Sequence, residues 1–152
     1  MAYSAEEARS QLLDDLAAAI DQLAFALAGL GAAYDELDER AADVLEEEIF
    51  KPLQGAYGRA KRTHSEFAKR YRLRERTFED RSPGTRSGDP RVYLERAIEA
   101  IEQADHSIAE LQDSMMPVEV GDTELRAGLS ETRSLIAELP ARGRRLVRAR
   151  GR

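Results

Sequence analysis

The feature that most constrains this chain is a series of apolar residues spaced alternately three and four positions apart across residues 16–44. The series consists of Leu16, Ile20, Leu23, Leu27, Leu30, Tyr34, Leu37, Ala41 and Val44. Side chains at this spacing share one face of an α-helix. Ser4, followed by Glu7, forms a capping box of the kind that begins a helix. We find neither strand alternation nor a repeat of about 20–50 residues, so the sequence predicts an all-α protein.

We expect this face to belong to one long helix from about Ser4 to about Phe50. Gly29 and Gly31 lie within it, and each costs about 1 kcal/mol relative to alanine in a helix interior. The alternative is a first helix that ends at Gly29 or Gly31, followed by a second that begins near Asp35. The acidic residues after that point would suit a helix N-terminus.

Pro52 has no backbone N–H to donate and its ring clashes with the preceding turn. We therefore expect the helix to break or kink at Lys51. The apolar series then resumes and predicts a second helix that ends near Asp80. This second series consists of Leu53, Tyr57, Ala60, His64, Phe67, Tyr71 and Phe78. Residues 81–89 read RSPGTRSGD and are predicted to form a long loop.

Two further helices are predicted from their start signals. Asp89 followed by Pro90 is an N-cap followed by the residue favoured at the first helical position, and this third helix should end at Pro117. Asp122 caps a fourth helix, and Pro140 either ends it or begins a terminal basic helix. The pattern predicts an antiparallel bundle of about four helices, the first of them long.

The charge is unevenly distributed, because the chain carries −6 overall while its last twelve residues carry +6. We therefore divide the chain into a helical domain, residues 1–140, with a charge of −12, and a basic tail, residues 141–152. The tail contains Arg142, Arg144, Arg145, Arg148, Arg150 and Arg152 and no acid. These arginines can bind nucleic acid, an anionic membrane surface or an acidic protein, or they can fold back on the acidic domain. The tail lacks aromatic residues for stacking on bases.

A second basic feature lies in the predicted second helix, where four basic residues share one stripe. They are Arg59, Arg62, Lys69 and Arg76. Nucleic acid can lie along such a stripe. We favour pairing of this stripe with the acidic block of residues 35–48, from a neighbouring helix or from a second subunit, because the acidic domain repels phosphate.

The N-terminus and the apolar segments indicate the compartment. The first seven residues are acidic and lack the basic region of a signal peptide. The longest uncharged stretch, residues 22–34, is shorter than the roughly 18 to 20 residues that span a bilayer. We therefore expect a cytoplasmic protein without a transmembrane helix. The absence of cysteine removes disulfides and thiolate chemistry.

The residues available for catalysis or metal binding are few. His64 lies on the apolar face of the second helix, where we expect a half-buried structural residue with one hydrogen-bond partner. Glu102 and His106 are one turn apart, but two ligands do not make a metal site. Neither histidine follows the Glu-x-x-His spacing of di-iron bundles. We therefore predict no catalytic, cofactor or metal site, with a small-ligand or metal-binding bundle as a further alternative.

The sequence thus predicts a non-enzymatic helical interaction protein, a scaffold or adaptor that forms a homo-oligomer through its first helix. Residues 22–34 are apolar nearly all round, whereas a surface helix keeps a charged face. Either the core of the bundle or a partner chain must cover this stretch, and of the two we favour the core. The predicted interface consists of Leu23, Leu27, Leu30, Tyr34 and Leu37. The alternative is a nucleic-acid-associated protein that binds through the tail.

Overall fold

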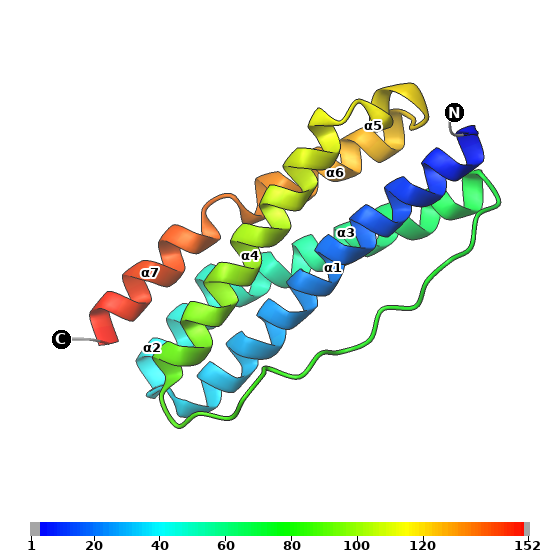
Figure 1. Ribbon diagram of the computed structural model, residues 1–152. Coiled ribbons are helices and arrows are strands. Elements are labelled where there is room, and N and C mark those ends of the chain that lie inside the picture. The colour runs from blue at the N-terminus through cyan, green and yellow to red at the C-terminus, as the bar shows by residue number, and fades with distance from the viewer. Residues whose placement is uncertain (1–3, 151–152) are drawn as a thin grey trace.

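A computed structural model describes residues 4–150, and within them every regular element is helical. The elements are α1 (Ala5–Glu36), α2 (Glu39–Leu45), the π-helix η1 (Glu46–Phe50), α3 (Lys51–Arg70), α4 (Pro90–Asp113), α5 (Met116–Glu119), α6 (Thr123–Ile136) and α7 (Leu139–Arg150). They pack as a helical bundle, which confirms the predicted fold class (Figure 1).

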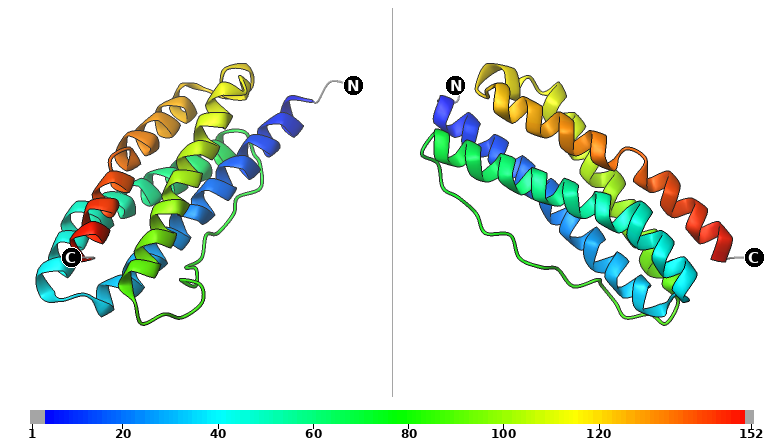
Figure 2. Two further views of the ribbon diagram at one scale, coloured as in Figure 1. Left: turned by 60° about the vertical axis from the view of Figure 1, so that its left-hand side comes forward. Right: turned by 180° about the vertical axis from the view of Figure 1, so that it is seen from behind.

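The bundle consists of two antiparallel pairs of helical rods (Figures 1 and 2). In the first pair α1 runs against α2, η1 and α3, and in the second α4 runs against α6 and α7. The pairs are joined by residues 71–89, an irregular segment that returns along the whole length of the bundle and that we call the strap. The most extensive packing joins the two pairs, α1 on α4 and α3 on α6.

Helix α1 begins as the sequence predicts, because the Ser4 Oγ accepts a hydrogen bond from the Glu7 amide at 3.1 Å. Its alanine-rich face lies against α4, where Ala26 is fully buried. A Cβ at Gly29 would lie 3.2 Å from the Tyr93 carbonyl oxygen. Small residues thus let the two backbones approach closely, and this packing outweighs the low helix propensity of glycine.

The predicted end of the first helix is wrong in both of its versions. α1 continues through both glycines and ends at Glu36, well before Phe50. Leu37 is extended, and the Asp38 carboxylate accepts a hydrogen bond from the Ala41 amide at 2.9 Å to begin α2. The apolar spacing runs on in phase across this two-residue break, so the periodicity did not reveal it.

Of the predicted break or kink at Lys51, the break does not occur, since the chain stays helical from Glu39 to Arg70. The turn before the proline widens into η1, in which the Lys51 amide bonds to the Glu46 carbonyl. Pro52 has no N–H for the Glu48 carbonyl oxygen, and this oxygen instead accepts a hydrogen bond from Arg142 Nη1 at 2.9 Å. A wider turn and a distant arginine therefore accommodate the proline.

Helix α3 ends at Arg70 instead of Asp80, so the loop is longer than residues 81–89. Arg72 adopts a left-handed conformation with φ 54°, and the Leu73 amide bonds back to the Ala68 carbonyl at 2.8 Å. This is the Schellman geometry that usually recruits glycine. With arginine at this position the sequence carried no stop signal.

The later helix starts follow the prediction. The Asp89 carboxylate accepts a hydrogen bond from the Arg91 amide at 3.0 Å and begins α4. The Asp122 carboxylate accepts one from the Leu125 amide at 2.8 Å and begins α6. α4 ends at Asp113, earlier than the predicted Pro117, because a left-handed Met115 (φ 70°) separates it from α5.

The predicted basic tail is helical, since Pro140 lies in the first turn of α7. Leu139 and Leu146 are buried, and Gly143 faces Ile98 of α4 with no room for a side chain. Arg152 lies outside the described residues. Up to Arg150 the arginine-rich segment is therefore packed on the bundle.

Helix α1 is long and apolar enough to cross a membrane by length and composition alone. Of its most apolar 18-residue window, 56% is buried within the bundle. Core helices of soluble proteins pass the same criterion, so this observation is weak evidence for a span. The absence of a transmembrane helix stays a prediction.

Candidate binding surface at the α2 and α7 end

The arginines of α7 point to two sides of the helix. On the side of α4, Arg144 donates a hydrogen bond to a Glu102 carboxylate oxygen at 2.7 Å. Arg148 lines the same shallow surface together with Glu95 and Glu99. The α4 side is therefore a zone of mixed charge in which arginines face acids.

On the other side of α7, four arginines surround one hollow of about 410 Å³, which we call the arginine hollow. Arg142, Arg145 and Arg150 come from α7, and Arg40 comes from α2. Apolar residues complete the lining, namely Ala41, Val44, Leu146 and Ala149. The hollow thus combines guanidinium groups with an apolar surface.

The charges of the arginine hollow do not balance. Asp38 and Glu48 are the acids in its lining, against four arginines. Arg150 lies 3.6 Å from an Asp38 carboxylate oxygen. Arg40 and Arg145 form no ion pair with any residue that the structure describes. Both side chains are exposed and free to meet a ligand.

Sequence reasoning placed the α7 arginines in a binding site but missed Arg40 and Val44. Arg40 is the single base within the acidic block of residues 35–48, and this contrast was a signal. Its position opposite Arg145 depends on the chain reversal after α1, which the sequence did not reveal. Val44, 37% exposed, is one of five large apolar residues exposed among those described.

The predicted interface residues of the first helix are distributed differently. Leu23 and Leu30 are 0% and 1% exposed in the bundle's own core, so they cannot form an accessible interface. Leu27 is half-buried in a hollow beneath the strap, and Leu37 is half-buried at the break after α1. Only Tyr34, 42% exposed, lies at the surface.

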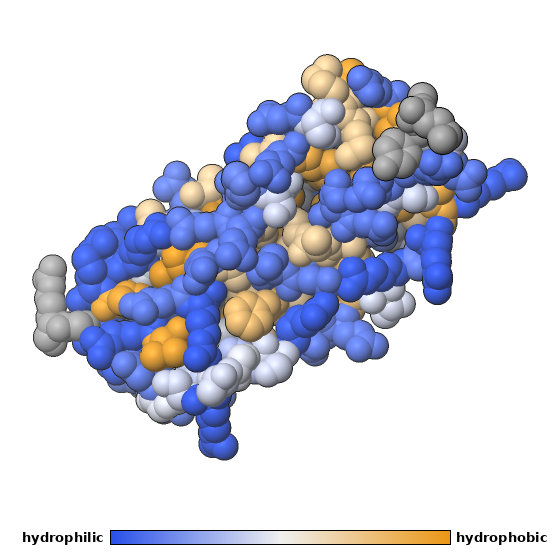
Figure 3. Space-filling view, in the orientation of Figure 1, coloured by the Kyte–Doolittle hydropathy of each residue, from blue (hydrophilic) through white to orange (hydrophobic). Residues whose placement is uncertain are grey.

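The molecular surface matches this distribution. Figure 3 shows hydrophilic residues over most of one face, with apolar residues in small separate patches. The large apolar side chains exposed among the described residues are Tyr34, Val44, Met115, Val118 and Leu135. They come from different elements, and Val44 alone among them belongs to the arginine hollow.

The basic stripe of α3 pairs with other acids than predicted. Arg59 contacts Glu131 of α6 at 2.7 Å, and Arg76, which belongs to the strap, contacts Asp21 of α1 at 2.8 Å. The acidic block of residues 35–48 lies at the opposite end of α3 from the basic residues near its C-terminus (Figure 1). The pairing of stripe and acidic block within one chain was therefore a wrong prediction.

The two histidines differ in burial and in hydrogen bonding. His106 is exposed with its Nε2 2.9 Å from a Glu110 oxygen, while Glu102 pairs with Arg144. His64 is 3% exposed, and its Nδ1 has no hydrogen-bond partner among the described residues. It is thus more buried than the half-buried residue we expected. Within residues 4–150, no group of three or more potential ligands could hold a metal ion.

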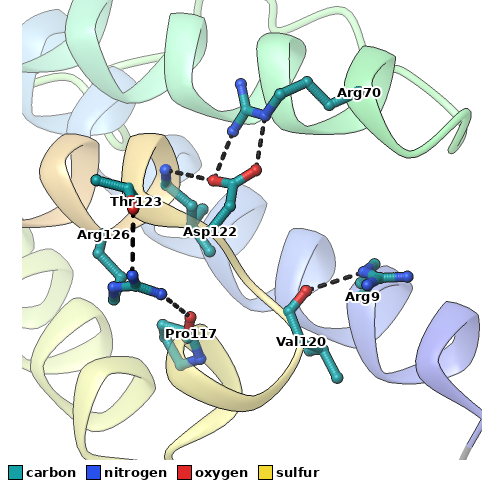
Figure 4. Close-up of polar contacts among 8 residues, drawn as sticks. Arg9, Arg70, Pro117, Val120, Asp122, Thr123 and Arg126 are labelled. Carbon is teal, nitrogen blue, oxygen red and sulfur yellow. Dashed lines mark hydrogen bonds and ion pairs between the residues drawn. The ribbon is translucent and has the colours of Figure 1, made fainter.

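A polar network at the α5 end of the bundle uses three more arginines (Figure 4). Arg70 of α3 donates to both oxygens of Asp122, at 2.7 and 2.9 Å. Arg9 and Arg126 each donate to a backbone carbonyl of the α5 corner, at 2.9 and 3.0 Å. Because each of these arginines already has a partner, the network stabilises the corner and does not form a vacant site.

Comparisons with known proteins found no matching protein-family model, no matching curated protein and no matching solved structure.

Proposed function

We propose that the protein is a non-enzymatic helical interaction protein that binds an acidic segment of a partner protein in the arginine hollow. The observation that carries the proposal is the convergence of Arg40 with three α7 arginines around an apolar lining. The expected compartment of such an adaptor remains the cytoplasm.

The chemistry of the hollow selects its partner. Guanidinium groups bind carboxylates through two parallel hydrogen bonds. The apolar lining of Ala41, Val44 and Leu146 favours a segment that also carries aliphatic side chains. Amphipathic segments commonly dock in this way, with apolar anchors in a groove and charges at its rim. An acidic amphipathic segment satisfies both halves of the lining.

The way in which the arginines are held also favours binding of an acidic segment. A single exposed ion pair contributes only about 0–1 kcal/mol. Here several guanidinium groups stand on α7, which is anchored through buried Leu139 and Leu146. Arg142 is held further by its bond to the Glu48 carbonyl. Anchored groups lose less freedom on binding than those on a disordered tail.

Nucleic acid is the second candidate, because Arg40 and Arg145 are exposed without an ionic partner among the described residues. Phosphate contacts would make binding fall steeply with salt, with a slope of about −0.9 for each phosphate neutralised. The two acids in the hollow and the negative charge of the whole chain, −6, oppose this reading.

The proposal is tested by fluorescence anisotropy with a labelled peptide in which leucines are flanked by glutamates. Because α7 is packed on the bundle, charge-neutralising substitutions are better than truncation. The double variant R40Q/R145Q should weaken binding about tenfold or more, since two unpaired guanidinium groups are lost. The matched control R144Q/R148Q, on the α4 side of the same helix, should change it by less than about twofold.

Equal losses in the two double variants would contradict the proposed site. If duplex DNA bound more tightly than the peptide, and if this binding fell steeply with salt, nucleic acid would be the ligand of the hollow instead.

Self-association through the first helix stays a separate prediction, now limited to Leu27, Tyr34 and Leu37. Tyr34→Asp should lower the mass in light scattering if exposed Tyr34 joins two copies. Replacing Leu23 or Leu30 would instead unfold the bundle, since both are core residues. An unchanged mass for the Tyr34 variant would contradict an interface at this position.

A further inference from the structure

The strap is held to the bundle by side-chain contacts and not by secondary structure. Residues 71–89 contain no helix or strand, and most of their side chains are exposed. Three strap side chains pack against the core, namely Tyr71 directly after α3, Leu73 and Phe78. The strap runs along the α1 and α3 side of the bundle (Figure 2), where it lines hollows together with residues of both helices.

Phe78 rests on His64 of α3. The two rings meet edge to face, with centroids 5.2 Å apart and planes at 88°. Arg76 lies over the Phe78 ring with its guanidinium carbon 4.9 Å from the centroid. The imidazole is 3% exposed, and its Nδ1 has no partner among the described residues. A proton added at this nitrogen would therefore be buried without a hydrogen-bond acceptor among the described residues.

Charged groups reach His64 from each side. Burial lowers the pKa of His64 most, and Arg76 on the strap lowers it further. A hydrogen bond with the Leu13 backbone, Asp14 on α1 and Glu75 on the strap act in the opposite direction. The pKa of His64 remains below its ordinary value. Because the strap supplies Phe78, which covers the ring, and Arg76, which lowers this pKa, the closed strap favours the neutral imidazole. By linkage, the protonated imidazole favours the open strap.

The other attachments of the strap are polar contacts. Near α4 the Ser87 amide donates to the Tyr93 hydroxyl at 2.7 Å, and Arg96 Nη1 donates to the Thr85 carbonyl at 2.6 Å. The attachments of the middle of the strap are exposed. Asp21 of α1 accepts from Arg76 at 2.8 Å and lies 3.0 Å from Arg81. Glu75 accepts from the Ser65 hydroxyl at 2.8 Å. Exposed ion pairs of this kind contribute little to stability. The part of the strap over His64, residues 73–81, is therefore held mainly by Leu73 and by the contact of Phe78 with His64.

The strap does not fill the groove that it covers. A hollow of about 560 Å³ lies beside His64, between residues 73–77 and the first turns of α1. A second, of about 630 Å³, lies beside residues 80–83 and is lined in part by Leu27, Ala28 and Tyr57. Release of this part of the strap therefore further exposes Leu27 of the α1 apolar series.

We propose that the strap is a pH-operated cover of the α1 and α3 groove, released when His64 is protonated beneath Phe78. The device is independent of the arginine hollow, which lies on other elements. It gives the chain a second, conditional apolar surface whose exposure increases as the pH falls from neutral toward about 5.

The test uses the fact that the chain has no tryptophan. The F78W variant places a single tryptophan on the strap where Phe78 contacts His64, and its fluorescence reports on this contact. Between about pH 7.5 and about pH 5, its emission should shift to longer wavelength while far-UV circular dichroism stays unchanged. The shift should vanish in F78W/H64Q, which cannot be protonated at this site. It should persist in the matched control F78W/H106Q, which removes the exposed histidine.

The unmodified protein supplies a second readout that does not depend on how tryptophan packs. With only two histidines in the chain, proton NMR can follow the His64 ring directly. Its titration midpoint should lie below about 6.5, and the Phe78 ring resonances should move with the same midpoint. A shift of one pKa unit corresponds to a tenfold change in the ratio of closed to open strap.

Two results would overturn the proposal. One is an emission shift that remains in F78W/H64Q, because the release would then not depend on His64. The other is a His64 titration during which the Phe78 resonances do not move, because the strap would then stay seated over a protonated imidazole.

Discussion

Gly128 shows at the residue scale how closely α3 and α6 approach each other. A Cβ at this position would lie 2.1 Å from the Thr63 hydroxyl oxygen, which itself is bonded to the Arg59 carbonyl. Gly31 of α1 has nothing within 4 Å of the same virtual atom. Two glycines in helices thus have opposite roles, one required by packing and one merely tolerated.

We expect Gly128→Ala to destabilise the bundle by about 1–3 kcal/mol, because the added methyl overpacks the contact with Thr63. Gly31→Ala should leave the free energy of unfolding unchanged or raise it by up to about 1 kcal/mol, since alanine is the better helix former. Urea unfolding measures both. Equal effects of the two substitutions would contradict the close contact between α3 and α6.

Asp122 shows at the element scale how one side chain fixes the orientation of a helix. Its carboxylate caps α6 through the Leu125 amide and binds Arg70 of α3 through both oxygens. Burial alone would raise the pKa of Asp122, but the hydrogen bonds from Arg70 and Leu125 outweigh it and hold this pKa below its ordinary value. The ionised form is thus the one that joins α3 to α6.

Asp122→Ala should lower the free energy of unfolding by about 1–2 kcal/mol, because it removes the cap and leaves Arg70 unpaired. Asp122→Asn is the matched control and should cost less, since asparagine also caps helices. The contribution of the ionised carboxylate is present above about pH 4 and is lost as the pH falls through the lowered pKa. An Asp122→Ala variant that unfolds at the same acidic pH as the unmodified protein would contradict this role.

A helix boundary could be predicted where the residue that determines it lies at the boundary itself. Helix starts were predicted at Ser4, Asp89 and Asp122 because an N-cap acts through its own side chain. The end of α3 was missed because the left-handed position is held by Arg72 instead of glycine. The effect of Pro52 was misjudged because the Glu48 carbonyl, which loses its backbone partner at the proline, is satisfied by Arg142, far along the chain.

At the scale of the whole molecule, the fold class followed from the apolar periodicity, whereas the candidate site followed only in part. The arginines of α7 are obvious in the sequence, but their division between Glu102 on one side and Arg40 on the other depends on how α7 packs. The same holds for His64, which is covered by Phe78 from the strap and not from its own helix.

The central claim is that an acidic segment binds in the arginine hollow, and the most direct test is a titration of the glutamate and leucine peptide followed by NMR of the arginine Nε–Hε groups. The account predicts shifts at Arg40, Arg142, Arg145 and Arg150, with Arg144 and Arg148 unchanged as internal controls on the same helix. Shifts confined to Arg144 and Arg148, or no shifts at peptide concentrations of about 1 mM, would contradict it.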